Sequence, residues 1–155
     1  IKHFGDESKN IYNYSVPGSW ADADQLVVGD YGLSLNQQKL QMALWSIMNS
    51  PLFISADVRH MVPESRDILL NERAINISQD TLGIMGTRTM VIGGIHIWTK
   101  PIQPTGSYAI LLLYTNGSGG PKKVSVKLSD LHIYSAPAYD FVDIFANKTM
   151  GVYKP

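Results

Sequence analysis

The sequence contains no cysteine, so these 155 residues hold no disulfide bond and no thiolate metal ligand. It also lacks an excess of either charge, because Lys plus Arg and Asp plus Glu both number 13 and neither sign forms a run. This balance removes the usual reason to propose a nucleic acid or an anionic membrane as a partner. The longest apolar run, Ala109 to Tyr114, is far shorter than the roughly 20 residues of a membrane-spanning helix. We therefore expect no membrane span and a neutral ligand.

Several sites of catalysis and binding are also missing from the sequence. The four histidines have no close ligand spacing, so no metal site is expected; they are His3, His60, His96 and His132. Glycine-rich phosphate-binding motifs and the G-x-S-x-G motif are absent, which removes the simplest phosphate, dinucleotide and serine-hydrolase interpretations. Because the sequence begins with Ile1 and not with Met, we expect any targeting segment to lie outside these residues.

What is present is the composition of a globular protein with a core, with 45% hydrophobic and 17% charged residues. Four N-x-Ser/Thr sequons, at Asn13, Asn76, Asn116 and Asn147, weakly indicate a secreted or lysosomal glycoprotein. Apolar neighbours predict that Asn76 is too buried for modification. The expected glycosylation sites are therefore Asn13, Asn116 and Asn147.

The first half of the chain has helical periodicity. Ser34 and Gln37 form an S-x-x-Q capping box that predicts the start of a helix. The apolar stripe of that helix consists of Leu40, Ala43, Leu44, Ile47 and Met48. Before it, Trp20 to Val28 is predicted as a strand or strand end. After it, Pro51 to Ser55 is typical of a strand that is buried on both faces.

A second helix is predicted from Glu64 to Leu70, with Pro63 suited to its first turn. The order strand, helix, strand, helix is typical of parallel βα units, and two such units cannot close a sheet by themselves. Their open edges predict that the isolated chain is prone to aggregate.

From about Thr89 onward, short runs rich in β-branched and aromatic residues alternate with glycine, proline and asparagine turns. This pattern is typical of an antiparallel sandwich. The candidate strands are Met90 to Trp98, Tyr108 to Tyr114, Lys123 to Leu128 and Tyr139 to Phe145. Turns at Gly93-Gly94, 104–106 and 116–120 are expected to separate or interrupt them. A domain boundary near Gly86 is expected, which divides the chain into residues 1–86 and 87–155.

Two pairs of charged residues are candidates for a binding site. Asp22 and Asp24 would share one face of an extended segment, where two carboxylates beside an aromatic residue could bind a sugar. The alternative, which spacing alone favours, is that both carboxylates cap turn amides. Asp57 and Arg59 could position a ligand, although a local ion pair or a helix cap is the more common role of such residues.

Four segments together resemble glycoside hydrolase family 27. Residues 17–34, PGSWADADQLVVGDYGLS, are similar to the family's P-G-x-W-N-D-P-D-M-L-x-I-G-N-x-G-L-S signature. QMALWSI at 41–47 and PLFISADVR at 51–59 resemble Q-M-A-L-W and A-P-L-x-x-S-x-D-L-R. ISQDTLG at 77–83 stands where the family has I-N-Q-D-P-L-G. The resemblance is strong over residues 17–86 and weak in the β-rich half.

This resemblance implies a fold and an activity. The family has a (β/α)₈ TIM barrel followed by an antiparallel β-domain, and it releases terminal α-linked galactose or N-acetylgalactosamine by double displacement. The chain would supply the last two βα units of the barrel and part of the β-sandwich domain. The nucleophile and the acid/base of the family precede the tryptophan motif, so no catalytic residue is expected here and the chain alone is expected to be inactive. The resemblance implies no cofactor, and a homodimer of the full-length protein is a further expectation.

The resemblance also assigns roles to four residues. Asp24 matches the family's aspartate at the border of the sugar pocket, and Gln25 takes the place of the neighbouring methionine. Asp22 and Trp20 match residues that support the site loop. The expected ligand is therefore a terminal α-galactoside or α-N-acetylgalactosaminide.

The sequence departs from the family's pattern at three positions of this loop. Ala21 and Ala23 stand where the family usually has Asn and Pro, and Gln25 stands where it has Met. Since proline fixes its own φ and restricts the preceding residue, these changes predict a looser loop. They leave open an alternative: a non-catalytic carbohydrate-binding or interaction protein derived from the family.

Overall fold

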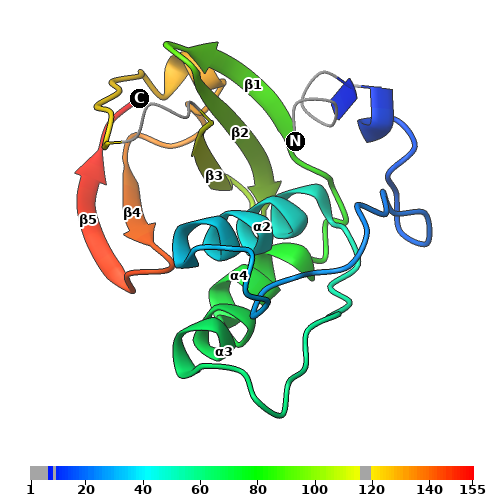
Figure 1. The fold of residues 1–155 in the computed structure, drawn as a ribbon. Helices are drawn as coiled ribbons and strands as arrows, with labels where there is room; N and C mark the ends of the chain where they lie inside the picture. The colour runs from blue at the N-terminus through cyan, green and yellow to red at the C-terminus, as the bar shows by residue number, and fades with distance from the viewer. Residues whose placement is uncertain (1–6, 9, 116–119) are drawn as a thin grey trace.

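The computed structural model describes residues 7–8, 10–115 and 120–155. Helices occupy the first half of the described chain and antiparallel strands the second (Figure 1). The elements are α2 Leu35–Met48, α3 Pro63–Leu69, α4 Glu72–Ser78, β1 Thr87–Ile92, β2 Ile95–Ile102, β3 Ser107–Tyr114, the 3₁₀ helix η1 Ser129–Leu131, β4 Tyr139–Asp143 and β5 Lys148–Tyr153. None of the described helices is long and apolar enough to cross a membrane.

Helix α2 confirms the predicted capping box. The Ser34 hydroxyl accepts a hydrogen bond from the Gln37 backbone N–H, and the Gln37 side chain accepts one from the Ser34 N–H at 2.9 Å. The helix ends at Asn49, a C-cap with the left-handed φ of 56°. Both ends of α2 are therefore fixed by local sequence.

Helix α3 was expected one residue later, and Pro63 indeed occupies its first turn. Helix α4 was not predicted, although its signal is present. Asn71 is its N-cap, and the Asn71 side chain accepts a hydrogen bond from the Ala74 N–H at 3.0 Å. The helix is only two turns long, which is too short for periodicity to reveal it.

The two predicted parallel strands are reduced to one bridge between Leu26 and Ile54. The Leu26 N–H donates to the Phe53 carbonyl at 2.6 Å, and the Ser55 N–H donates to the Leu26 carbonyl at 3.0 Å. The direction is right, but the predicted strand lengths are wrong. Burial of 51–55 on both faces is also wrong, since Phe53 and Ile54 are 67% and 44% exposed. A strand is buried on both faces only when further layers cover it, and a pattern of apolar residues does not guarantee those layers.

Strands β1, β2 and β3 form an antiparallel sheet in chain order, and β4 and β5 form an antiparallel pair. The candidate run 90–98 is divided between β1 and β2, because Gly93 and Gly94 adopt positive φ and turn the chain there, which confirms the turn expected at these two glycines. The predicted strand 108–114 is confirmed as β3.

The remaining strand predictions fail in part. Residues 123–128 form no strand and pair with no described strand, although Val124 and Val126 pack against the hydrophobic core. Strand β4 ends at Asp143, because the Asp143 side chain accepts from two backbone N–H groups of the following turn. Strand β5 was not predicted: exposure of most of its residues hides the alternation.

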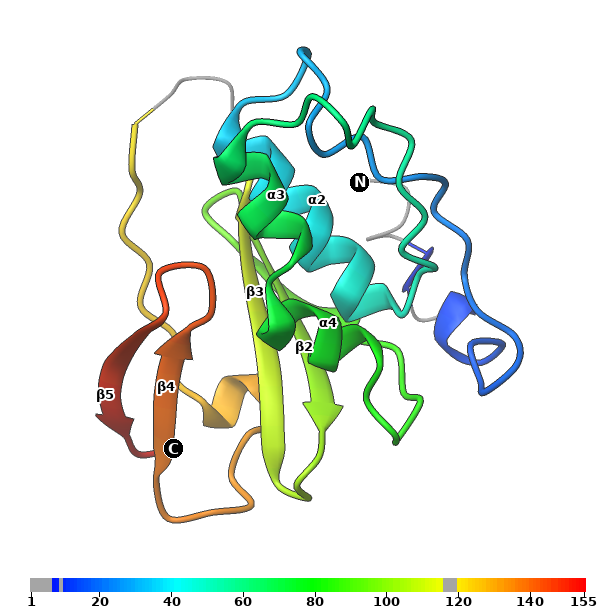
Figure 2. The same ribbon diagram turned by 90° about the horizontal axis from the view of Figure 1, so that it is seen from below.

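Both sheets contact one hydrophobic cluster. Its fully buried members are Ile95, Ile97, Leu128, Leu131 and Ile133, and Tyr139 and Phe141 of β4 pack against them. Figure 2 shows the β4–β5 pair beside β3, with the helices across the sheet from η1. The antiparallel β character predicted for this half is therefore confirmed.

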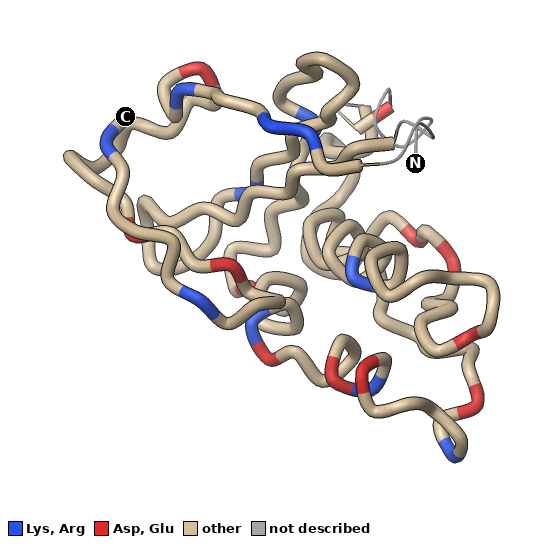
Figure 3. The backbone as a smooth tube through the Cα atoms, turned by 60° about the vertical axis from the view of Figure 1, so that its left-hand side comes forward, with Lys and Arg blue, Asp and Glu red and all other residues tan. Residues whose placement is uncertain are grey.

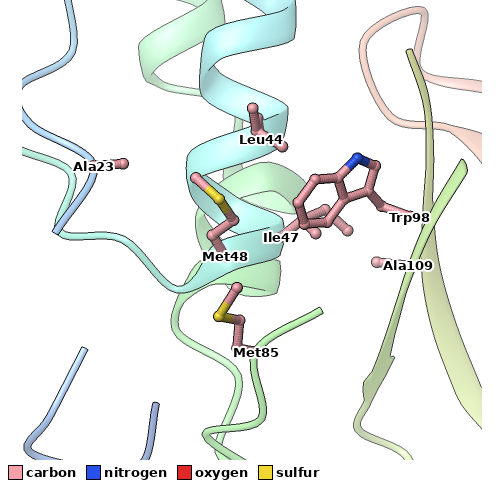
Figure 4. Packing of buried hydrophobic residues seen from close by; sticks show 7 residues of the cluster. All are labelled: Ala23, Leu44, Ile47, Met48, Met85, Trp98 and Ala109. Carbon is pink, nitrogen blue, oxygen red and sulfur yellow. The ribbon is translucent and has the colours of Figure 1, made fainter. Parts of the chain in front are cut away.

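A second cluster joins the helical half to the sheet (Figure 4). Trp98 of β2 points toward Leu44 and Ile47 of α2, and Met85 lies below Met48. At Gly86 the chain comes so close to α2 that an added Cβ would lie 2.6 Å from Ile47 Cγ2. The Gly86 N–H also donates to the Ile47 carbonyl at 2.8 Å. The predicted boundary thus falls where the two halves are in intimate contact, and the division into two domains stays a prediction.

Candidate functional site

One face of α2 holds the backbone of the loop formed by residues 20–29. Gln38, Gln41 and Trp45 are three and four residues apart and so share this face. Gln41 Oε1 accepts from the Val27 N–H at 3.0 Å, and Gln41 Nε2 donates to the Gln25 carbonyl at 3.2 Å. Trp45 Nε1 donates to the Asp24 carbonyl at 2.7 Å. Side chains of a rigid helix thus fix the loop where no strand ladder does.

Ser50, directly after the C-cap of α2, holds the start of the same loop. The buried Ser50 hydroxyl donates to the Ala21 carbonyl at 2.6 Å and accepts from the Ala23 N–H at 2.8 Å. A proline at position 23 has no N–H and could not make the second bond. The expected loosening at Ala23 is therefore offset by a hydrogen bond that alanine permits.

The structure places Asp22 and Asp24 on the exposed side of the loop, and both cap turn amides. Asp22 Oδ1 accepts from the Asp24 N–H at 3.1 Å, and Asp24 Oδ1 accepts from the Gln25 N–H at 2.7 Å. Asp24 has a φ of 74°, so the expected extended geometry is wrong at this residue. Within the described ranges neither carboxylate has a cationic partner. One oxygen of each carboxylate remains for a ligand.

The other two predicted loop residues lie on either side of this pair. Trp20 is 40% exposed, and its ring lies over Gly83, where an added Cβ would be 3.3 Å from Trp20 Cη2. Gly83 closes the ISQDTLG segment, so two segments of the resemblance meet here. Gln25 is exposed, while its carbonyl is held by Gln41. The structure thus brings Trp20, Asp22, Asp24 and Gln25 together on one loop.

Comparison with known proteins identifies the family of this loop. The sequence pattern of the family described as α-galactosidase A matches residues 1–80, about half of the chain. The chain belongs to the α-galactosidase A family. The resemblance to family 27 glycoside hydrolases is thereby confirmed.

Individual members of the α-galactosidase A family match beyond the first half. Human α-galactosidase A is 37% identical over 79% of this chain and 28% of its own length. Chicken α-N-acetylgalactosaminidase is 34% identical over 91% of this chain and 35% of its own length. The crystal structure of α-galactosidase I from Mortierella vinacea superposes with a TM-score of 0.79 at 22% identity, over 88% of this chain and 35% of that one. The chain therefore spans about a third of the length of these relatives.

The family segment 51–59 ends in an exposed ion pair. Arg59 Nε and Nη2 donate to both carboxylate oxygens of Asp57, at 2.9 and 2.8 Å. The same hydrogen bond lowers the pKa of Asp57 to about 2, with a smaller contribution from the backbone N–H of Arg59. His60 Nδ1 lies 3.4 Å from the same carboxylate. The local ion pair that was expected as the common alternative is the one observed.

Lys100 is a buried charged residue that was not predicted from the sequence. Its side chain is fully buried on β2. The sequence pattern gave no reason to expect that this lysine faces the interior. Lys100 Nζ donates to the Ser46 carbonyl at 3.2 Å, to Asn49 Oδ1 and to the Ile77 carbonyl. Burial lowers the pKa of Lys100 to about 8, and the nearby charge of Asp80 opposes this shift.

The other charged residues are spread over the described part of the chain. Figure 3 shows Lys and Arg interspersed with Asp and Glu along the chain. No group of three or more His, Asp or Glu side chains that could hold a metal occurs in the described part of the chain. Asn13 and Asn147 are exposed in turns, and Asn116 lies outside the described residues. The expected burial of Asn76 is wrong, since it is exposed on α4.

Proposed function

We propose that the full-length protein is a retaining exo-α-glycosidase that releases terminal α-linked galactose or N-acetylgalactosamine, with Asp24 and Gln25 at the border of the sugar site. The observation that carries this proposal is the exposed Asp24 carboxylate on a loop whose backbone is fixed by Trp45, Gln41 and Ser50. A carboxylate oxygen accepts hydrogen bonds from sugar hydroxyls, and a fixed backbone keeps that oxygen in place before the sugar arrives. Trp20 and Asp22 support the loop.

The chemistry itself belongs outside this chain. A retaining mechanism needs two carboxyl groups about 5 Å apart on opposite sides of the scissile bond. Asp22 and Asp24 are two residues apart on one loop, so they approach a ligand from the same side. Each also uses one oxygen to cap a turn amide. The family resemblance places the nucleophile and the acid/base before the tryptophan motif, which supports their location upstream of this loop and an inactive isolated chain.

The proposal includes the surroundings of the site. Residues 1–86 form the last two βα units of a (β/α)₈ barrel, and residues 87–155 form part of a β-sandwich domain. The full-length protein is a lysosomal or secreted glycoprotein modified at Asn13, Asn116 and Asn147. It acts as a homodimer and needs no cofactor.

Hydrolysis of 4-nitrophenyl α-galactoside and its N-acetylgalactosaminide counterpart tests this function. We expect activity in the full-length protein and none in the 155-residue chain. Asp24→Asn keeps the shape of the side chain and removes its charge, and it should raise KM by about tenfold or more, as for a lost hydrogen bond to a charged group. Asp30→Asn, in the exposed turn after the loop, is the matched control and should leave KM unchanged. Activity of the 155-residue chain alone would contradict the proposal.

The departures at Ala21, Ala23 and Gln25 favour a second candidate, a non-catalytic carbohydrate-binding protein. This candidate requires that the full-length protein hydrolyse neither substrate and still bind galactose. Isothermal titration of the full-length protein with galactose distinguishes the two. Binding that Asp24→Asn abolishes, in a protein without activity, would establish the second candidate.

A further inference from the structure

The buried ammonium of Lys100 lies between the ends of two helices. Two of its acceptors are main-chain carbonyls, Ser46 in the last turn of α2 and Ile77 in the last turn of α4. A helix C-terminus carries partial negative charge, so a cation at this place is favoured by both helices at once. The third acceptor is the side chain of Asn49, the C-cap of α2. Lys100 thus fixes the end of α2 from the β-rich half.

The same end of α2 fixes the loop that carries Asp24. Asn49 is followed directly by Ser50, and both residues are buried. The N–H groups of Asn49 and Ser50 both donate to the Trp45 carbonyl. The Ser50 hydroxyl bridges Ala21 and Ala23, and the Trp45 indole holds Asp24. These hydrogen bonds form a continuous route: Lys100 holds Asn49, the adjacent Ser50 holds residues 21 and 23, and Trp45 holds Asp24.

We propose that Lys100 is a positioning residue for the sugar-binding loop: through Asn49 and Ser50 it sets the backbone of residues 21–24 and with it the place of the Asp24 carboxylate. The role of the loop rests on the function proposed above. The route itself rests only on hydrogen bonds within this chain. The β-rich half therefore contributes to sugar affinity without touching the sugar.

Asn49→Gly is the variant that tests the route with least damage to the fold. Glycine adopts the left-handed φ of position 49 without strain, and the substitution removes the side chain whose Oδ1 accepts from Lys100. Asn147→Gly is the matched control, because Asn147 also has a left-handed φ, of 47°, and lies in the turn between β4 and β5. Protein from bacterial cells avoids any effect of a glycan at Asn147.

Hydrogen exchange of the full-length protein, followed by mass spectrometry, gives a readout that does not depend on activity. In Asn49→Gly, the peptide spanning residues 20–25 should exchange about tenfold faster, since the Ser50 hydroxyl that accepts from the Ala23 N–H is no longer held in place by its neighbour. Peptides from the middle of α2 and from β3 should be unchanged, and Asn147→Gly should leave all of these peptides unchanged. Unchanged exchange at 20–25, or an equal rise in all peptides, would overturn the proposal.

Kinetics of the same variants separate this proposal from the proposed function. Asn49→Gly should raise KM for the 4-nitrophenyl glycoside about fivefold and leave kcat within about twofold, because the catalytic carboxylates lie elsewhere. If the Lys100→Met variant folds, it should show the same changes in KM and kcat. If it does not fold, Asn49→Gly alone provides the test. An unchanged KM in an active enzyme would overturn the positioning role. Faster exchange at 20–25 in a full-length protein without activity would support the positioning and reject the proposed function.

Discussion

The protein has an ion pair that is exposed to water and a lysine that is buried. Asp57 and Arg59 form a bidentate ion pair with side chains that are 47% and 78% exposed. Lys100 is fully buried, and three oxygen atoms from two helices surround its ammonium. The exposed pair has short, well-directed hydrogen bonds, yet water and salt screen it. The buried group has no such screening, so its contacts determine more of the fold.

The comparison shows that geometry alone does not measure the importance of a charge. The Asp57–Arg59 pair is local, since both residues belong to one turn, and the further contact of Asp57 is with His60 of the same turn. Lys100 joins α2, α4 and β2, which are far apart in the sequence. Removal of the pair should therefore change a turn, and removal of Lys100 should change how the two halves of the chain pack. Three predictions test this contrast.

Lys100→Met should have the largest effect. Methionine has a similar length, but it leaves two carbonyls and Asn49 Oδ1 buried without their donor. We expect the free energy of unfolding to fall by about 3 to 5 kcal/mol, as for the loss of one partner from a buried charged network. Urea unfolding of the full-length protein, followed by tryptophan fluorescence, measures this change. Lys123→Met removes an exposed lysine of the β-rich half and should leave the midpoint unchanged. Equal effects of the two substitutions would remove the contrast.

The pH dependence of stability should report the same lysine with a smaller effect. The pKa of Lys100 is lowered by burial from 10.5 to about 8, so between these values the unfolded chain binds more protons than the folded one. The contribution of Lys100 to the free energy of unfolding therefore rises with pH across this window, by at most about 1.4 kcal/mol per unit. The difference between wild type and Lys100→Met, measured from about pH 7 to pH 10, cancels the titration of other groups. If the free energy of unfolding of wild type minus that of Lys100→Met falls as the pH rises, the pKa of Lys100 is raised, and the three acceptors stabilise the ammonium more than burial destabilises it.

The contrast also explains which parts of the fold could be predicted from the sequence. Helix α2 was predicted because its capping box and apolar stripe are local signals. Strand β3 was also predicted from a local signal, its continuous run of apolar residues. The turn at Gly93–Gly94 was likewise predicted from its two glycines. Strand β5 and the exposed segment 51–55 were missed or misassigned, because pairing and burial depend on neighbours that are distant in the sequence.

The candidate site divides in the same way. The loop residues Trp20, Asp22, Asp24 and Gln25 were predicted together because they form one continuous motif. The side chains that hold the loop, Gln38, Gln41, Trp45 and Ser50, could be seen only once α2 was placed beside it. Lys100 is farther still in sequence, and a lysine in a strand gives no sign that it is buried.

Asp57→Asn should have the smallest effect, despite the shift of the Asp57 pKa to about 2. A lowered pKa means that the contribution of this carboxylate is present above its ordinary value of 3.8 and is lost as the pH falls toward 2. Because the pair is exposed, screening by water reduces that contribution, and the urea midpoint at neutral pH should be unchanged within error. High salt should change nothing further. The contrary outcome is a clear loss of stability on Asp57→Asn in the wild type and no loss when the same substitution is made in the Arg59→Gln variant. That result would show that the exposed pair, and not only the buried lysine, holds the fold together.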